Sequence, residues 1–427
     1  MKGNFIKYRV RQPKGVAVQK HNKWQIIGLC CLVYFVSYYT RKDFTAVMAS
    51  LIRQNLISKA TGGWIGTALF ISYGIGQVFC GVLADRFSPK ALLGCGLALA
   101  GICNLLMPTA ITAGLAVPLW TINGFAQSFM WPPIVRILAD NLDKERFVTA
   151  NFLVSSSSHI STILLYLYVP LCLRFFSWQF VFFSATVLAI IALLSTVVGL
   201  SVIWPGSHTS KSKTPQATSN RNNGFLTVIS SAGALPLIIC IVVTGYLRDG
   251  IESWLPTLYC EAFQKSDNEA IFLSAILPVF SMVSITAITV AHRSRTFNNE
   301  ALGSACLFAV AAVLCVPLCL LLKTQLSSSR FLCLILASLI CGCMHACAFL
   351  LISCLPGRFS KYGVVATVSG TCNAFVYLGS AVSMYGIPAI TQTEGWRGAV
   401  ISWALIALIG VIFALWGKRK YTYFISH

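Results

Sequence analysis

Charged residues are scarce in this sequence of 427 residues: 10% are Asp, Glu, Lys or Arg, whereas 56% are hydrophobic. An ordinary soluble domain has roughly 25% charged residues, so this composition excludes a water-soluble globular protein. Acidic residues are the scarcest, with 12 Asp and Glu against 32 Lys and Arg. Most of the basic excess falls in short segments between apolar runs, which indicates membrane topology and no nucleic-acid partner.

The sequence also lacks the motifs of enzymes. It has no strand-linked phosphate loop, nucleophile elbow or metalloprotease helix, so we expect no enzyme and no cofactor. The run from Cys341 to Cys347 contains three cysteines and His345. On a helix, Cys341 and His345 share one face while Cys343 and Cys347 share another, so four ligands do not converge and we expect no metal. Most of the 17 cysteines lie in apolar runs, where a thiol packs as a small hydrophobe, and no disulfide framework follows.

Apolar segments dominate the remainder of the chain, and about 20 such residues cross a bilayer. The sequence therefore predicts an all-α polytopic membrane protein with twelve transmembrane helices in two pseudo-symmetric six-helix halves. The predicted spans are 24–52, 61–84, 91–113, 115–138, 149–172, 177–204, 228–259, 270–291, 301–322, 331–355, 363–390 and 396–417.

The longest polar interruption, 205–224, divides six spans from six. We accordingly expect a basic cytoplasmic tail (1–23), an N-terminal half (24–204), a cytoplasmic central loop (205–227), a C-terminal half (228–417) and a cytoplasmic tail (418–427). With the N-terminus inside, cytoplasmic segments hold 21 Lys and Arg and external segments hold seven. This asymmetry predicts that both termini are cytoplasmic.

The two halves echo each other. Tyr39-Thr40-Arg41 in the first span recurs as Tyr246-Leu247-Arg248 in the seventh, and Trp178 at the sixth span recurs as Trp396 at the twelfth. The offsets are 207 and 218 residues, both near half the chain length. Such repeats are typical of carriers whose site lies between the halves at the midplane.

Arg41 and Arg248 are the principal candidates for a binding site. Arg41 lies about 15 residues into its span, roughly 22 Å from the membrane surface. A buried arginine costs at least ~2.5–3.5 kcal/mol on insertion scales, so it is expected to face a wet cavity or a partner. Two guanidinium groups from opposite halves would match a phosphate or carboxylate.

Structural ion pairs are the alternative for these charges. Glu252 follows Arg248 by four residues, so the two could pair along one helix face, whereas Asp249 and Asp43 point elsewhere. Lys42 either lines the edge of the cavity or pairs with Asp43.

The segment Gly81-Val82-Leu83-Ala84-Asp85-Arg86-Phe87-Ser88-Pro89-Lys90 resembles the G-x-L-A-D-R-x-x-x-K loop of the major facilitator superfamily. The resemblance implies the major facilitator fold, and it implies that Asp85 and Arg86 act in gating between inward and outward states. The matching loop of the second half, 291–295, lacks the Gly and the Asp, so any gating contact in that loop is weaker or different.

Four further segments are similar to the organophosphate:phosphate antiporter family. They are Tyr38-Tyr39-Thr40-Arg41-Lys42-Asp43-Phe44 with Met48, the stretch from Tyr246 to Thr257, Trp131-Pro132-Pro133, and Phe375-Val376-Tyr377-Leu378-Gly379. The resemblance implies that Arg41 and Arg248 bind the substrate phosphate. We expect Tyr38, Tyr246, Lys42 and Trp131 at the wall of the site or as hydrogen-bond donors.

Some positions depart from that family. His159 falls two residues later than the family histidine, a rotation of about 200° on a helix, which puts its facing toward the cavity in doubt. The second-helix lysine of the family is replaced by Gln77. The run Ser155 to Ser158 either supplies hydroxyl donors to a substrate or helps helices to pack closely.

The predicted function is exchange of an organic phosphate, such as a sugar phosphate or glycerol phosphate, for inorganic phosphate by alternating access. The alternatives are a membrane receptor for a phosphorylated sugar with the same fold, and a facilitator for another organic anion. The expected partners are these two phosphates and the lipid bilayer. We expect a monomer, in the inner membrane if the source is bacterial.

Overall fold

The computed structural model describes residues 22–203, 234–294, 299–324, 329–362 and 365–426, and within these ranges every regular element is helical. The first group of helices is α1 (Asn22–Arg53), α2 (Lys59–Arg86), α3 (Pro89–Thr112), α4 (Ala116–Gln127), α5 (Trp131–Asn141), α6 (Lys144–Phe175) and α7 (Gln179–Ile203). The second group is α9 (Ala234–Ala262), α10 (Asp267–Ser274), α11 (Ile276–Arg293), α12 (Glu300–Thr324), α13 (Ser329–Ala348), η1 (Phe349–Cys354), η2 (Leu355–Tyr362) and α14 (Val365–Ser426).

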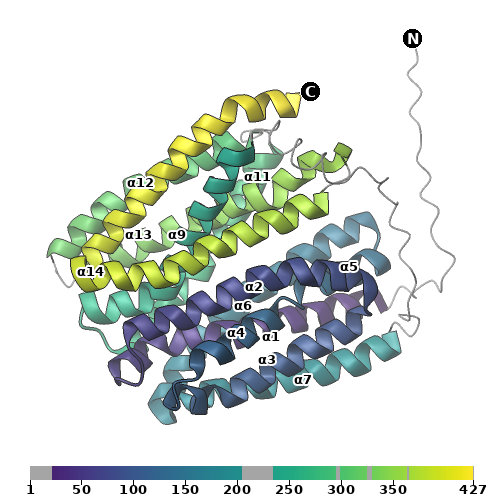
Figure 1. The fold of residues 1–427 in the computed structure, drawn as a ribbon, viewed down its shortest axis with the longest axis horizontal. Helices are drawn as coiled ribbons and strands as arrows, with labels where there is room; N and C mark the ends of the chain where they lie inside the picture. The colour runs from purple at the N-terminus through teal and green to yellow at the C-terminus, as the bar shows by residue number, and fades with distance from the viewer. Residues whose placement is uncertain (1–21, 204–233, 295–298, 325–328, 363–364, 427) are drawn as a thin grey trace.

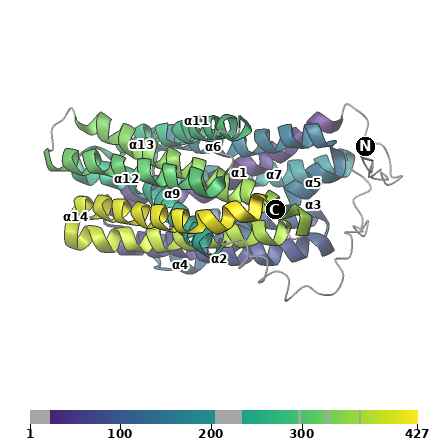
Figure 2. The same cartoon turned by 90° about the horizontal axis from the view of Figure 1, so that it is seen from above.

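The two groups form two bundles that lie side by side. Figure 1 shows α1–α7 in purple to blue below α9–α14 in green to yellow. Seen from above, the helices of both groups run roughly along one common axis (Figure 2). The predicted all-α fold of two halves is confirmed.

The predicted spans correspond to these helices once interrupted and merged helices are taken into account. The fourth span is α4 followed by α5, the eighth is α10 followed by α11, and α14 contains the last two spans. By length and composition, eight helical segments within the described residues are apolar enough to cross a membrane. Helices α1 and α9 are not among these eight segments, and both carry charged side chains near the middle.

The interruptions have local causes in the sequence. Between α4 and α5, Pro132 and Pro133 each lack a backbone N–H and disfavour a helical conformation in the preceding residue. Within α14, Gly395 has φ +65°, a left-handed conformation that glycine adopts without a Cβ clash, and it separates the two spans.

Side-chain caps define the start of several helices. Ser58, Ser88 and Ser266 each accept a backbone N–H at the beginning of α2, α3 and α10. Asp143 does the same for α6 with the N–H of Arg146, and this hydrogen bond holds the pKa of the exposed Asp143 carboxyl below its ordinary value. Each cap satisfies one of the free amides of a first helical turn.

The halves meet mainly at four helix pairs. α2 packs against α14, α6 packs against α10 and α11, and α1 packs against α9. Gly63 and Gly66 of α2 allow the close approach to α14, because a Cβ at either position would meet Met384 at less than 3.0 Å. The α1–α9 contact places the first helix of each half at the centre of the interface.

At its C-terminal end α14 continues beyond the predicted span, to Ser426. The Tyr421 hydroxyl donates to the buried carboxylate of Glu300 at 2.8 Å, and Arg358 also donates to Glu300 at 2.8 Å. Phe424 packs against Phe359 with ring centroids 5.0 Å apart. These contacts fix the end of α14 to its own half.

Candidate anion-binding site

Helices α1 and α9 bring three buried cations to the boundary between the halves. Arg41 and Lys42 come from the middle of α1, and Arg248 comes from the middle of α9. Two of the three have a carboxylate partner, Lys42 with Glu252 and Arg248 with Asp249. Arg41 is the cation for which no carboxylate partner is described.

Arg41 is held by aromatic rings. Its guanidinium carbon lies 4.2 Å from the ring centroid of Tyr38 and 5.1 Å from that of Tyr73, and only 6% of the residue is exposed. Desolvated cation–π contacts contribute about 2 kcal/mol each. Its Nε has no hydrogen-bond partner among the described residues. The charge of Arg41 is therefore only partly compensated, and it has a donor available for an anion.

Arg248 forms a two-point ion pair with its neighbour Asp249. Nε lies 3.0 Å from Oδ1 and Nη2 lies 2.8 Å from Oδ2. Asp249 also accepts a hydrogen bond from Ser380 of α14. The predicted alternative, in which Arg248 pairs with Glu252, is wrong because Glu252 is taken by another cation. Nη1 of Arg248 has no hydrogen bond to any of the described residues, so it forms the open edge of the fork.

Lys42 crosses the boundary between the halves. Its Nζ lies 3.1 Å from Oε2 of Glu252 on α9, and both side chains are almost fully buried. Of the two predicted alternatives for Lys42, the pair with Asp43 is not present, because its ammonium group is paired with Glu252. Asp43 faces the other side of α1, where its Oδ1 accepts the N–H of Phe44 at 2.7 Å and its Oδ2 has no described partner.

Two tyrosines interact with both arginines. Tyr38, which lies against the Arg41 guanidinium, and Tyr377 each interact electrostatically with Arg41 and Arg248. Tyr377 comes from α14 of the opposite half, and its ring centroid lies 4.4 Å from that of Tyr73 on α2. The two guanidinium groups thus converge on one aromatic cluster shared by both halves.

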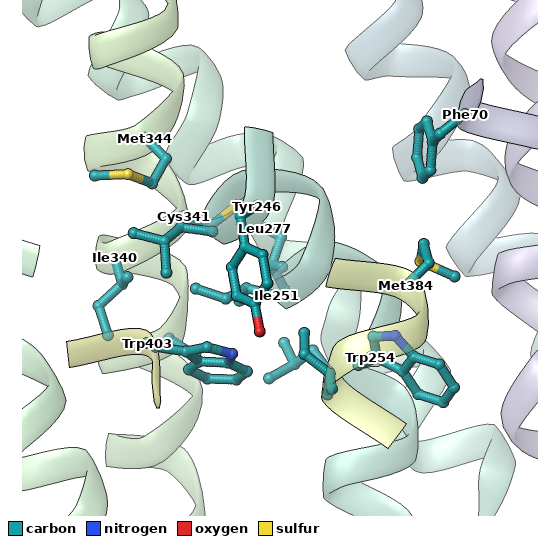
Figure 3. Packing of buried hydrophobic residues seen from close by; sticks show 14 of the residues in the cluster. Phe70, Tyr246, Ile251, Trp254, Leu277, Ile340, Cys341, Met344, Met384 and Trp403 are labelled. Atoms are coloured by element: carbon teal, nitrogen blue, oxygen red, sulfur yellow. The ribbon is translucent and has the colours of Figure 1, made fainter. Parts of the chain in front are cut away.

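The other predicted wall residues divide into two groups. The ring centroid of Trp131, the first residue of α5, lies 5.0 Å from that of Tyr34. The Tyr34 centroid lies 5.0 Å from that of Tyr38, so Trp131 is joined to the aromatic cluster through Tyr34. Tyr246 lies in the hydrophobic core, with Ile251 and Leu277 nearby (Figure 3). Its hydroxyl lies close to Gly386. The structure therefore does not bring Tyr246 to the arginines.

Tyr73 and Tyr377 were not among the predicted site residues. Tyr377 belongs to the segment 375–379 that resembles the antiporter family, and Tyr73 lies four residues before Gln77, where the chain departs from that family. Their position near Arg41 could not be predicted, because it depends on how α2 and α14 approach α1. The periodicity of a single helix carries no information about that approach.

His159 faces the opposite half. Its ring centroid lies 5.9 Å from that of His345 on α13. Ser157 and Ser158 donate their hydroxyls to carbonyl oxygens of their own helix, Val154 and Ser155. These two serines therefore serve the helix itself in this structure.

At the end of the bundle opposite the start of α1, ion pairs join the two halves. Arg53 lies 3.1 Å from Asp267, and Lys59 lies 2.6 Å from Glu261. Trp396 donates its indole N–H to the same Glu261 at 2.8 Å. These residues form a latch across this end of the bundle.

The predicted gating residues Asp85 and Arg86 fall in the last turn of α2, and their side chains lie outside the described part of the structure. Nearby, Arg136 of α5 donates to the carbonyl of Phe87 at 3.4 Å and pairs with Asp140. Their gating role stays a prediction. Among the described residues, no group of three or more His, Cys, Asp or Glu side chains is placed to hold a metal ion.

Two six-helix halves around a cationic centre define a polytopic membrane transporter of the facilitator type. Residues 30–370 match the Major Facilitator Superfamily, and the chain belongs to this family. Among solved structures, a POT family transporter in complex with 5-aminolevulinic acid superposes with a TM-score of 0.73 at 14% identity, covering 93% of this chain and 96% of the other. This likeness is one of fold.

Curated relatives confirm the resemblance to the organophosphate:phosphate antiporter family. A probable hexose phosphate transport protein of Chlamydia muridarum is 24% identical over 414 residues, 90% of this chain and 88% of the relative. The glycerol-3-phosphate transporter of Haemophilus influenzae is 34% identical over 125 residues, 28% of this chain and 26% of the relative. The membrane sensor protein UhpC of Escherichia coli is 30% identical over 107 residues, 25% and 24% of the two chains.

Proposed function

We propose that this protein exchanges an organic phosphate for inorganic phosphate across the membrane, by alternating access to a site between its halves. The observation that carries the proposal is the convergence of Arg41 and Arg248, one from each half, on Tyr38 and Tyr377. Guanidinium groups match phosphate oxygens with paired donors. The names of the hexose phosphate and glycerol-3-phosphate relatives support an organic phosphate as substrate.

Charge compensation supplies the coupling between binding and movement. With no anion bound, closing the halves around Arg41 buries a guanidinium that no described carboxylate neutralises. A bound phosphate dianion accepts hydrogen bonds from Arg41 and from the free edge of Arg248, and cancels this charge. The anion must favour the occluded state over the open one, since a ligand shifts an equilibrium only by its differential affinity. The carrier without an anion then does not readily switch back to its first state. Each transport cycle therefore exchanges one anion for another.

In this proposal the start of α1 faces the cytoplasm, as the distribution of Lys and Arg predicts. The latch of Arg53, Lys59, Glu261 and Asp267 then closes the external end. Asp85 and Arg86 would gate the cytoplasmic end. The protein would function as a monomer in the inner membrane of a bacterium.

The test is phosphate counterflow in liposomes that contain the purified full-length protein. Vesicles loaded with unlabelled phosphate should accumulate labelled phosphate, and external glucose 6-phosphate or glycerol 3-phosphate should compete. Arg41→Lys should lower exchange by about a hundredfold or more, because a point ammonium does not reproduce the planar fork. Wild-type vesicles without counterflow, or an Arg41→Lys variant with normal exchange, would overturn the proposal.

A receptor for a phosphorylated sugar is the second candidate. The similarity to the membrane sensor protein UhpC favours it, as does the loss of Gly and Asp from the loop 291–295. A receptor binds the same anion through the same arginines but does not exchange it. Saturable binding of glucose 6-phosphate without counterflow would identify the receptor.

A further inference from the structure

The two facing histidines, His159 and His345, make the same kind of hydrogen bond to their own helices. Nδ1 of His345 lies 3.1 Å from the carbonyl oxygen of Cys341, and Nδ1 of His159 lies 3.1 Å from that of Ser155. We assign the hydrogen to Nδ1 in each ring, because a carbonyl oxygen only accepts. The hydroxyl oxygens of Ser281 and Ser158 also lie 3.0 and 3.5 Å from these nitrogens, and both hydroxyls donate to carbonyl oxygens of their own helices. In a neutral imidazole the other nitrogen, Nε2, is then an acceptor. Within the described part of the chain, no hydrogen bond involves either Nε2.

Tyr166 adds a hydroxyl group to the same region. It lies seven residues after His159, so the two share one face of α6. Tyr166 is fully buried, and its hydroxyl has no hydrogen-bond partner among the described residues. An unpaired buried hydroxyl lowers the stability of the folded protein by about 1–3 kcal/mol. A ligand that forms a hydrogen bond with the Tyr166 hydroxyl would remove this cost.

Glu252 joins these groups into one cluster. Cys341 Sγ lies 3.7 Å from Nδ1 of His345 and 3.8 Å from the backbone oxygen of Arg248, so α13 holds His345 against α9 one turn from Glu252. The Glu252 carboxylate interacts electrostatically with His159, Tyr166 and His345, which come from both halves. Lys42 already neutralises its charge at 3.1 Å. The negative charge of the cluster is therefore already balanced. Toward a ligand, the cluster presents three hydrogen-bond acceptors, which are two imidazole Nε2 atoms and a carboxylate, and one hydroxyl donor.

The interface is thus divided into two chemically different parts. One part holds Arg41, Tyr38 and Arg248 and suits the oxygens of a phosphate, which only accept. The other part holds Glu252, Tyr166 and the two histidines and would repel those oxygens. Arg248 and Glu252 are four residues apart on α9, so the two parts are separated by about 6 Å along that helix, close to the length of a sugar.

We propose that His159, Tyr166, Glu252 and His345 form a subsite that binds the hydroxyl groups of a sugar phosphate and gives the carrier its selectivity over inorganic phosphate. This inference rests on the proposed phosphate site at the arginines. Sugar hydroxyls both donate and accept, so they can donate to the imidazoles and to Glu252 and accept from Tyr166. Because the subsite is built from α6, α9 and α13, it closes only when the halves approach each other.

The test measures binding of radiolabelled glucose 6-phosphate, glycerol 3-phosphate and inorganic phosphate to the full-length protein in nanodiscs. Tyr166→Phe removes the hydroxyl alone, and His345→Asn removes the acceptor at the Nε2 position. Each should raise the Kd for glucose 6-phosphate relative to that for inorganic phosphate by about tenfold, the value of one hydrogen bond of this kind. Glycerol 3-phosphate, which has fewer hydroxyls, should respond less.

Two controls separate this role from a structural one. His345→Gln restores an acceptor near the Nε2 position and should recover the wild-type ratio. Tyr168→Phe makes the same chemical change on α6 but beside Tyr39 and Cys172, and should leave the ratio unchanged. Equal changes in the Kd for all three ligands, or no change in any, would overturn the subsite.

The two proposals fail in different ways. If the wild-type protein binds the three phosphates and the ratio does not respond to Tyr166→Phe and His345→Asn, the subsite alone is wrong. If Arg41→Lys leaves binding of inorganic phosphate intact, the phosphate site is wrong. If the wild-type protein binds none of these ligands, both proposals fall.

Discussion

At the scale of the residue, the charges in the middle of α1 and α9 differ in how they are compensated. Arg248 is held by Asp249 and Lys42 by Glu252, whereas Arg41 has aromatic rings in place of a carboxylate. Asp43 is a carboxylate with a single described hydrogen bond, from the backbone. Unpaired charges are costly inside a membrane. We therefore infer that the paired cations Arg248 and Lys42 stabilise the structure, whereas Arg41 is available to bind an anion.

The two buried aspartates should respond in opposite ways to removal of their charge. Asp249→Asn leaves Arg248 without its partner and should destabilise the protein by about 3–5 kcal/mol. Asp43→Asn removes a carboxylate that no described cation accompanies, so it should leave the stability equal or higher. Thermal unfolding of the purified variants in detergent measures both, and a larger loss for Asp43→Asn than for Asp249→Asn would contradict this account.

At the scale of the element, small residues determine how closely helices approach. A Cβ at Gly245 of α9 would lie 2.0 Å from the carbonyl oxygen of Val376 on α14, and a Cβ at Gly379 of α14 would lie 2.0 Å from that of Val242 on α9. The contact is reciprocal, as in membrane helices that pack through small residues. It places Tyr377 and Ser380 of α14 beside Arg248 and Asp249.

Gly245→Ala should therefore force α9 and α14 apart. Overpacking of this kind costs about 1–3 kcal/mol or more, and it should also weaken phosphate binding because Ser380 and Tyr377 move away from the site. Gly28→Ala is the matched control, since a Cβ there meets nothing within 4 Å and alanine favours the helix. Melting temperatures and phosphate binding of both variants check the expectation, which an unaffected Gly245→Ala protein would contradict.

At the scale of the whole molecule, the latch at the end of the bundle opposite the start of α1 joins the halves. Lys59 lies beside both Glu261 and the ring of Trp396, and Arg53 pairs with Asp267. Partly exposed ion pairs contribute only about 0–1 kcal/mol each, so the latch is weak enough to open during a transport cycle. It favours closure of this end without locking it.

Lys59→Glu should open the latch end of the bundle, because two carboxylates then face each other at the latch. Hydrogen–deuterium exchange should rise in the last turns of α1 and α9, and the double change Lys59→Glu with Glu261→Lys should reverse most of the rise. Lys265→Glu is the control, since Lys265 pairs with Glu269 within one half. A uniform rise throughout the protein would indicate unfolding instead, and an equal rise in the control would refute the latch.

Much of the architecture could be predicted from the sequence because it depends on local properties. Apolar length predicted the spans, and the break at Pro132 and the turn at Gly395 follow from the covalent structure of these residues. The echo between Arg41 and Arg248 pointed to the two helices that meet at the centre. The pairing of their charges could not be predicted in this way, since the i to i+4 rule suggested Glu252 for Arg248 and the structure has Asp249.

The sequence by itself determined that this is a membrane protein of two similar halves with an arginine buried in each. These properties follow from hydropathy, which each segment carries alone. Only the tertiary structure decided that Lys42 pairs with Glu252 and that His159 faces His345. Such contacts depend on the rotation and separation of helices that are far apart in the chain, and these are fixed by packing of the two halves against each other rather than by any single helix.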